Sequence, residues 1–260
     1  MTQEASQNES AENQRSTALA MVALTAPQWP APESILARLE ASLLDLSDFE
    51  HKDGAATCRI PGGQVGWVPM PVPIPWSDLE WACQAASWIW PEAVEVMSAH
   101  QAHFVVFASS TELDPVEVAL VVTQVAAAIA DCTPACGVYW GEASLVVEVN
   151  QFIEMAREGS REEPPVLLWI GIHPVKSSDG VSAYTTGLES FGHVELEAHD
   201  SGQDGPDLLQ QLAEVSFYIL SSDAELKDGD TLGEDELDRR PIRHVPSRYL
   251  EGKTVCLLPF

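Results

Sequence analysis

The segment from Val116 to Ala130 is apolar on nearly every side of the helix that it is expected to form. Asp114, Pro115 and Glu117 stand at its start, and they supply an N-cap, a first-turn proline and the glutamate of a capping box. Because such a helix must be covered on several sides, the chain needs further layers of structure around it. Polar residues interrupt the segment and it is too short to cross a bilayer, so no transmembrane helix is predicted.

Strands and helices alternate through the first half of the chain, and strands cluster in the second half. Strands are predicted at 19–26, in a short piece after residue 56, and at 103–109, 137–147, 165–172, 184–198, 242–245 and 255–258. Helices are predicted after Pro32, from Ser77, and at 115–130, 150–157 and 206–220. This order predicts an α+β fold, a mixed and largely antiparallel β-sheet with helices packed on it.

The length of 260 residues fits one large domain or two small ones. Residues 1–18 are polar and acidic and are predicted to be a disordered tail. Residues 19–260 are predicted to form a single α+β domain, or two closely packed halves with a boundary near residues 150–165.

The helix expected from Ser77 has a marked start. Ser77 is predicted to cap it, with Glu80 as the capping-box partner and with Trp76 and Trp81 in the positions of a hydrophobic staple. A proline-rich, extended segment ends just before it, at Pro75.

The charge of the chain limits its partners. A formal net charge of −27 arises from 40 acidic and 13 basic residues. Such a field repels phosphate backbones and anionic lipid, so neither direct nucleic-acid binding nor membrane binding is expected. The same field would attract a basic protein, although solubility alone also explains it.

The cysteines and the first residues predict a cytoplasmic location. Five cysteines in an odd, sparse set suit free thiols in a reducing compartment, and those at 132 and 136 are expected to be core or helix-end thiols. The acidic N-terminal residues lack the basic and apolar regions of a secretory signal.

Several short patches stand in an order that resembles a bacterial family, domain of unknown function 4261. They are Pro73–Trp76, Ala102–His103, Gly137–Gly141, Tyr184–Leu188, Phe191–Gly192 with Glu195–Glu197, and Asp228–Thr231. The resemblance spans roughly residues 20–260. It implies a domain type and assigns no activity, cofactor or catalytic residue. By analogy, the acidic charge also resembles that of immunity proteins that neutralise nuclease toxins.

The sequence HVELEAH at residues 193–199 alternates polar and apolar side chains. In a strand this pattern places His193, Glu195, Glu197 and His199 on one face and the apolar residues toward the core. We interpret that face as solvated, with two alternatives: a divalent metal shared by adjacent members, or a partner-binding face that includes Glu195 and Glu197. One ion cannot bind all four, because the outer pair would lie about 20 Å apart.

The strongest charge signal lies at residues 195–238, which hold fourteen acidic residues and one lysine. The default interpretation is a solvated loop. The alternatives are an acidic surface that fills a basic cleft and a cation loop at Asp228-Gly229-Asp230, which lacks the full EF-hand ligand series. The candidates for binding a partner are Asp228, Asp230, Glu234, Asp235, Glu236 and Asp238.

Five of the eight tryptophans fall between residues 67 and 90. Trp81 and Trp88 are seven residues apart and would share one helix face, which favours a core position. The functional alternative is an aromatic docking surface, with Trp67 and Trp76 as its candidates.

The sequence has no HExxH, GxSxG, GxGxxG or GxxxxGK[ST] motif, and His100 and His103 are expected to be structural. No catalytic residue, metal or other cofactor is predicted. The leading hypothesis is a non-enzymatic, cytoplasmic interaction protein, an immunity or antitoxin-like inhibitor of a basic protein such as a nuclease toxin. The alternatives are a metal-dependent hydrolase that uses Asp, Glu and His of the second half, and a structural homodimer.

Overall fold

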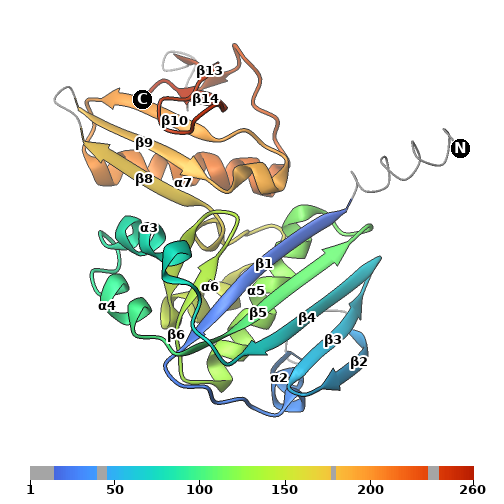
Figure 1. Cartoon of the computed structure of the whole chain (residues 1–260). Helices are drawn as coiled ribbons and strands as arrows, with labels where there is room; N and C mark the ends of the chain where they lie inside the picture. Colours follow the sequence, from blue (N-terminus) through green and yellow to red (C-terminus); the bar gives the residue numbers. More distant parts are fainter. Residues whose placement is uncertain (1–14, 40–45, 177–179, 234–239) are drawn as a thin grey trace, which may run out of the picture. The chain divides into compact units, whose positions relative to one another are not determined.

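The computed structural model describes residues 15–39, 46–176, 180–233 and 240–260. The chain divides into two compact units, which we describe separately (Figure 1). Unit 1 comprises Met1–Gly141 and Leu145–Arg161, and unit 2 comprises Glu142–Ser144 and Glu162–Phe260. Helices pack on largely antiparallel sheets, so the predicted α+β class is confirmed. The single domain predicted for residues 19–260 stays a prediction.

Unit 1 is built on a seven-stranded sheet in the order β2-β3-β4-β5-β1-β6-β7, and its described neighbours pair antiparallel. Its strands are β1 Ser16–Leu24, β2 Ser47–Lys52, β3 Ala55–Ile60, β4 Gly63–Met70, β5 Ala102–Ser110, β6 Ala135–Trp140 and β7 Leu145–Glu148. Its helices are α2 Pro32–Leu39, α3 Trp76–Ala86, α4 Ala93–Ser98, α5 Pro115–Cys132 and α6 Val149–Glu158. Strand β1 begins at Ser16, so residues 16–18 are not part of a disordered tail.

Helix α5 is the predicted apolar helix and lies in the core of unit 1. Its capping box is confirmed: the Asp114 carboxylate accepts from the Glu117 N–H at 2.8 Å, and Glu117 accepts from the Asp114 N–H at 2.8 Å. By length and composition α5 could cross a membrane, but 67% of it is buried inside the structure. It packs against β1, β5, α2 and α6, and this covering on several sides is typical of a core helix.

The predicted cap at Ser77 is wrong. Helix α3 begins at Trp76 with Pro75 in the N-cap position, where no side chain accepts from the backbone. The Ser77 hydroxyl instead donates to its neighbour Asp78. Proline at 75 fixes an extended backbone that leads into the helix, so the helix begins two residues earlier than a cap at Ser77 would place it.

The two helix starts give a matched pair of variants. Asp114→Ala should lower the free energy of unfolding of unit 1 by about 1 to 2 kcal/mol, because it removes a working N-cap. Ser77→Ala should change it by only a few tenths of a kcal/mol, because exposed residues outside a cap contribute little. Urea melts of both variants measure the difference. Equal midpoints would contradict the capping assignment.

The α3–α4 hairpin, residues 76–98, covers the face of the sheet to which Met21 and Ala23 of β1 belong. Buried residues of both helices, among them Leu79, Cys83 and Met97, form one apolar cluster with Ala23 and its neighbours in β6 and β7. The alternate β1 residues Ala20, Val22 and Leu24 are also buried, and they face α5. Unit 1 therefore has helices on both faces of its sheet.

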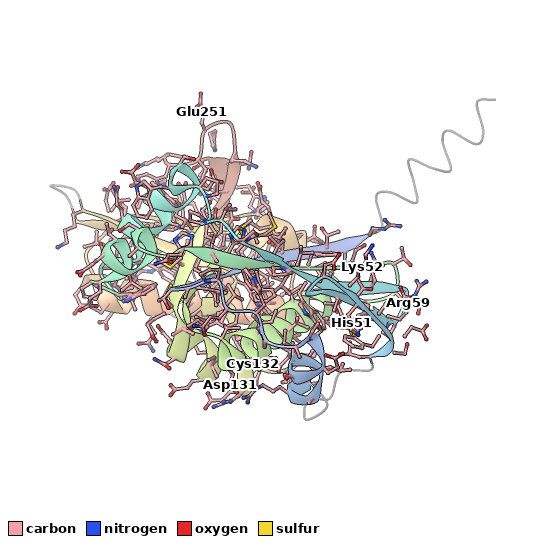
Figure 2. The ribbon with its side chains drawn as sticks, turned by 60° about the horizontal axis from the view of Figure 1, so that its bottom comes forward. His51, Lys52, Arg59, Asp131, Cys132 and Glu251 are labelled. Atoms are coloured by element: carbon pink, nitrogen blue, oxygen red, sulfur yellow. The ribbon has the colours of Figure 1, made fainter. Side chains whose placement is uncertain are left out.

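Cys132 and Asp131 lie side by side at the carboxyl end of α5 (Figure 2). Arg38 of α2 donates its Nε–H to the Cys132 thiol and forms an ion pair with Asp131. These contacts tie α2 to the end of α5. The position of Cys132 at a helix end is as predicted, Cys136 lies in β6, and all five cysteines are free thiols.

Unit 2 contains a five-stranded sheet in the order β13-β14-β10-β9-β8, in which β10 and β14 pair in parallel. Its elements are η1 Val166–Leu168, β8 Gly171–Lys176, β9 Val181–Thr186, η2 Leu188–Phe191, β10 Leu196–Ser201, α7 Gly205–Ser222, β11 Thr231–Leu232, β12 Arg240–Pro241, β13 Arg243–Pro246 and β14 Thr254–Leu258. The continuous strand predicted at 184–198 is wrong, because η2 separates β9 from β10. The strand predicted at 165–172 is also wrong at its start, where η1 lies.

Candidate functional site

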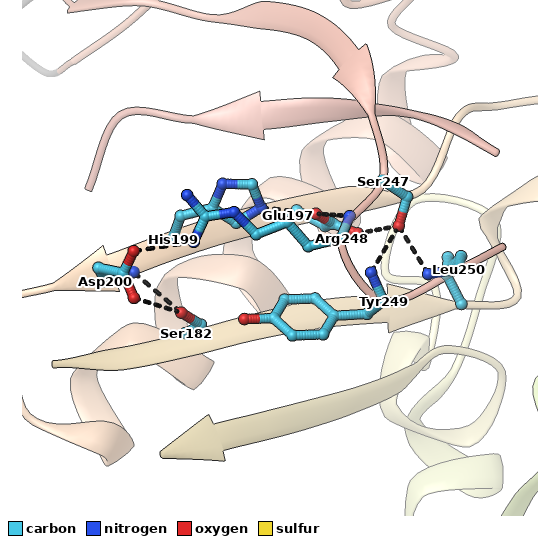
Figure 3. A network of polar contacts seen from close by, with 8 residues as sticks. All are labelled: Ser182, Glu197, His199, Asp200, Ser247, Arg248, Tyr249 and Leu250. Carbon is cyan, nitrogen blue, oxygen red and sulfur yellow. Dashed lines mark hydrogen bonds and ion pairs between the residues drawn. The ribbon is translucent and has the colours of Figure 1, made fainter. Parts of the chain in front are cut away.

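A buried carboxylate, Glu197 of β10, organises the polar interior of unit 2 (Figure 3). Its oxygens accept from the Ser247 hydroxyl, from the Arg248 N–H at 3.2 Å, and from His199 Nε2 at 2.6 Å. The Ser247 oxygen in turn accepts from the backbone N–H groups of Tyr249 and Leu250. Glu197 therefore fastens the turn at residues 247–250 onto β10.

This arrangement differs from a catalytic triad. In a triad the nucleophilic hydroxyl bonds to an imidazole that a carboxylate orients. Here the Ser247 hydroxyl donates to the carboxylate itself, and His199 contacts that same carboxylate from another side. The carboxylate and two backbone N–H groups hold the Ser247 hydroxyl in place, and we interpret the geometry as that of a structural clamp.

Aromatic stacking continues the clamp. The Tyr249 ring stacks on Tyr184 of β9 with ring centroids 5.1 Å apart, and the His173 ring of β8 lies 4.9 Å from Tyr184. Arg248 pairs with Asp200 at 2.8 Å, and the Asp200 N–H donates to Ser182 (Figure 3). Three neighbouring strands are thereby connected to the 247–250 turn.

Glu195 forms a second buried clamp. Its carboxylate accepts from the Thr185 hydroxyl at 2.6 Å, from the Gly187 N–H at 2.7 Å and from the Glu189 N–H at 3.2 Å. Burial raises the pKa of Glu195, and these donors oppose that rise. Gly187 has φ of +112°, and a Cβ there would lie 2.5 Å from the Trp169 carbonyl oxygen, so only glycine fits this turn.

The solvated face predicted for HVELEAH is therefore wrong, and so is the proposal of Glu195 and Glu197 as exposed partner-binding residues. Glu195 is 4% exposed and Glu197 is 0% exposed. The strand starts only at Leu196, so His193 does not share its face. The polar side of β10 is covered by segments more than 40 residues further along the chain, which a local alternation cannot reveal.

A partly open cavity of about 290 Å³ lies elsewhere in unit 2, beside the end of α7. Leu196, Ile219 and Leu226 contribute apolar lining, and Glu225 and Asp228 contribute carboxylates. His193 and His244 also line it, and neither residue was predicted from the sequence to line a pocket. Burial lowers the pKa of His193, and nearby Asp223 and Glu225 act against that shift.

Asp228 and Asp230 shape a turn beside this cavity. The Asp228 carboxylate accepts from the His244 N–H and that of Asp230 accepts from the Lys227 N–H, both at 2.8 Å. Of the two, Asp228 lines the cavity. The predicted acidic candidates Glu234, Asp235, Glu236 and Asp238 lie outside the described residues.

The tryptophans singled out in the sequence differ in their burial. Trp67 is fully buried, and among the described residues its indole N–H has no hydrogen-bond partner, so its prediction as a surface residue is wrong. Trp76 is partly buried against the α3–α4 cluster. Trp81 and Trp88, predicted to be core, are 45% and 49% exposed. Helix α3 ends at Ala86, so helical spacing does not extend to Trp88.

His100 and His103 have structural contacts, as predicted. His100 Nδ1 donates to the Met97 carbonyl while its Nε2 accepts from the Ile74 N–H, and His103 Nδ1 contacts the Val72 carbonyl. Both rings hold the proline-rich segment. In the part of the chain that the structure describes, no group of three or more His, Cys, Asp or Glu residues is placed to hold a metal ion.

The clamps, the cavity and the stacked tyrosines all belong to one continuous stretch of unit 2. Residues 184–258 match the family model of a domain of unknown function (DUF4261). The DUF4261 match includes Tyr184–Leu188, Glu195–Glu197 and Asp228–Thr231, and the patches quoted from the first half lie outside it. No curated protein and no solved structure matches the chain. Within the DUF4261 match, Thr185, Gly187, Glu195 and Glu197 hold the backbone together, and the residues that line the cavity lie in the same stretch.

Proposed function

We propose that this chain is a non-enzymatic interaction protein that binds a basic protein partner in the cytoplasm. The observation that carries the proposal is the cavity of about 290 Å³, which combines an apolar lining with Glu225 and Asp228. An arginine or lysine side chain suits such a site, because its aliphatic stem packs on apolar residues while its charged end meets carboxylates.

The charges around the cavity support a cationic occupant. Asp223 and Glu225 have side chains 85% and 79% exposed. Lys227 also lines the cavity and lies 3.3 Å from Glu225, but it is 68% exposed, and an exposed pair of this kind contributes at most about 1 kcal/mol. A guanidinium from a partner can therefore replace it at little cost. The net charge of −27 would speed the encounter at low salt.

The specific form of the proposal is an immunity or antitoxin-like inhibitor of a nuclease toxin. Nucleases bind phosphate with basic clefts, and a strongly acidic protein is complementary to such a cleft. The charge supports this form, and the five free thiols support a reducing compartment.

The test uses a fluorescein-labelled peptide of arginine and glycine and the full chain. We expect salt-sensitive binding that weakens at least severalfold in Asp223→Asn/Glu225→Gln/Asp228→Asn, because the variant removes two charges that line the cavity and a third beside His193 without changing side-chain size. The matched control is Glu33→Gln/Glu50→Gln/Asp53→Asn, which removes the same charge from exposed residues of unit 1. Equal weakening in both variants would show attraction by net charge alone, and it would overturn the role of the cavity.

A further inference from the structure

We infer that the outer face of the α3–α4 hairpin in unit 1 is a docking surface for a basic amphipathic helix of the partner protein. The inference rests on the proposed function and names a second contact and the kind of segment that occupies it. The docking surface consists of the exposed apolar side chains Trp81, Trp88, Ile89 and Val94 and the carboxylates of Asp78, Glu80, Glu92 and Glu95.

The apolar side chains are held in place by an ordered turn. Trp88 is 49% exposed and Ile89 is 55% exposed, whereas the adjacent Trp90 is buried in the core cluster. The N–H groups of Ile89 and Trp90 both donate to the Ala86 carbonyl at 2.9 Å. Trp90 therefore anchors the turn that presents Trp88 and Ile89 to solvent. Large apolar side chains gathered at one exposed place mark interaction sites on soluble proteins.

The charge of the α3–α4 hairpin indicates which kind of partner segment binds there. Between Arg59 and Arg157 the sequence contains eleven acidic residues and no lysine or arginine. The four carboxylates of the hairpin are exposed, and across the described part of the chain none of them forms an ion pair with a basic side chain. Charge complementarity therefore favours a lysine- or arginine-rich segment.

Other occupants fit this surface less well. A second copy of the chain would bring its own carboxylates against these, and like charges across an interface are unfavourable. Anionic lipid is repelled for the same reason. A basic amphipathic helix supplies both complements, because its apolar face packs on Trp88 and Ile89 and its cations meet the carboxylates and the faces of the exposed tryptophans.

The probe is a fluorescein-labelled amphipathic helix of leucine and lysine, titrated into the full chain and followed by anisotropy. We expect Trp88→Gln/Ile89→Gln to weaken its binding by tenfold or more, because aromatic anchors dominate interface energetics. The matched control is Leu167→Gln/Tyr218→Gln, which removes two equally exposed apolar side chains of unit 2 and should leave the affinity within twofold of wild type. Urea melts establish that both variants keep the wild-type fold.

The outcomes separate the two proposals. Equal affinities for the hairpin and control variants would overturn the docking surface, while loss of binding only in the cavity variant Asp223→Asn/Glu225→Gln/Asp228→Asn would leave the proposed function standing. A wild-type chain that binds neither basic peptide would overturn both. Concentration-dependent self-association in analytical ultracentrifugation that disappears in Trp88→Gln/Ile89→Gln would identify a second copy as the occupant and overturn the inference.

Discussion

Replacing Glu197 by alanine is expected to lower the free energy of unfolding of unit 2 by about 3 to 5 kcal/mol. Glu197 is fully buried, and its removal leaves the Ser247 hydroxyl, the Arg248 N–H and His199 Nε2 without their acceptor. These three hydrogen bonds are part-buried, and the loss of the acceptor from a donor shielded from water costs about 1 to 3 kcal/mol. The 247–250 turn should then detach from β10.

Amide hydrogen exchange is the appropriate measurement, because it reports on β10 and on the turn separately. We expect protection to fall at Leu196–Ser201 and at residues 247–250, with a smaller loss in Glu197→Gln, which keeps one acceptor oxygen. The matched control is Glu189→Ala, which removes a 49% exposed carboxylate from the same unit. If Glu197→Ala exchanged like this control, the carboxylate would not hold the turn.

The elements that the sequence predicted well are those whose signals are local. The start of α5 depends on Asp114 and Glu117, three residues apart, and the structure contains both hydrogen bonds of their capping box. Helix α7, predicted at 206–220 and found at Gly205–Ser222, has its apolar residues at regular helical spacing. In such elements the residues that determine the structure lie within one or two turns of each other.

The misassigned elements depend on residues distant in the sequence. A period of two at 193–199 shows only that two faces differ, and it does not show whether water or another segment covers the polar face. Ser247 and Arg248 cover it, about 50 residues beyond Glu197. The same limit applies to the cavity, whose histidines come from separate segments of unit 2.

The core positions predicted for Trp81 and Trp88 are wrong for a different reason. Trp81 and Trp88 satisfy a heptad spacing, but the spacing has meaning only within a continuous helix. Helix α3 ends at Ala86, after which a turn points Trp88 outward. Proline at 91 is a local sign of this ending, since a helix usually ends at or before the residue that precedes a proline.

Acid should destabilise unit 2 through His173. Burial lowers the pKa of His173 to about 4. The Thr186 hydroxyl donates its one proton to the Ala143 carbonyl, so it must accept from His173 Nε2, which lies 2.8 Å away. The neutral ring is therefore fixed in one tautomer between Thr186 and the Tyr184 ring, and a second proton would place a charge in a buried site.

Acid favours the unfolded state because that state binds a proton on His173 more readily than the folded state does. In the unfolded chain a histidine titrates near pH 6.5, so between about pH 6.5 and pH 4 the unfolded state binds more protons than the folded state. The contribution of the neutral His173 ring to the free energy of unfolding is complete above pH 6.5. It is lost as the pH falls to about 4, and the loss is roughly 3 kcal/mol for His173 alone. Burial also lowers the pKa of His193 in the same unit, which adds to the loss. Glu195 acts in the opposite direction, because its raised pKa favours proton uptake by the folded state.

Urea melts at pH 7.5, 6, 5 and 4.5, followed by a signal from unit 2, measure this loss in the wild type and in His173→Gln. Glutamine keeps a donor for Thr186 but does not titrate, so the variant should be less stable than the wild type at pH 7.5 because the ring contact with Tyr184 is lost. The difference in free energy of unfolding between the wild type and the variant should then narrow, or reverse, as the pH falls. Only the wild type has an imidazole at residue 173 that binds a proton in the unfolded state. His51→Gln, which removes an exposed histidine of unit 1, is the control for loss of any imidazole. A gap between the wild type and His173→Gln that stays constant from pH 7.5 to 4.5 would mean that His173 does not titrate differently in the folded and unfolded states.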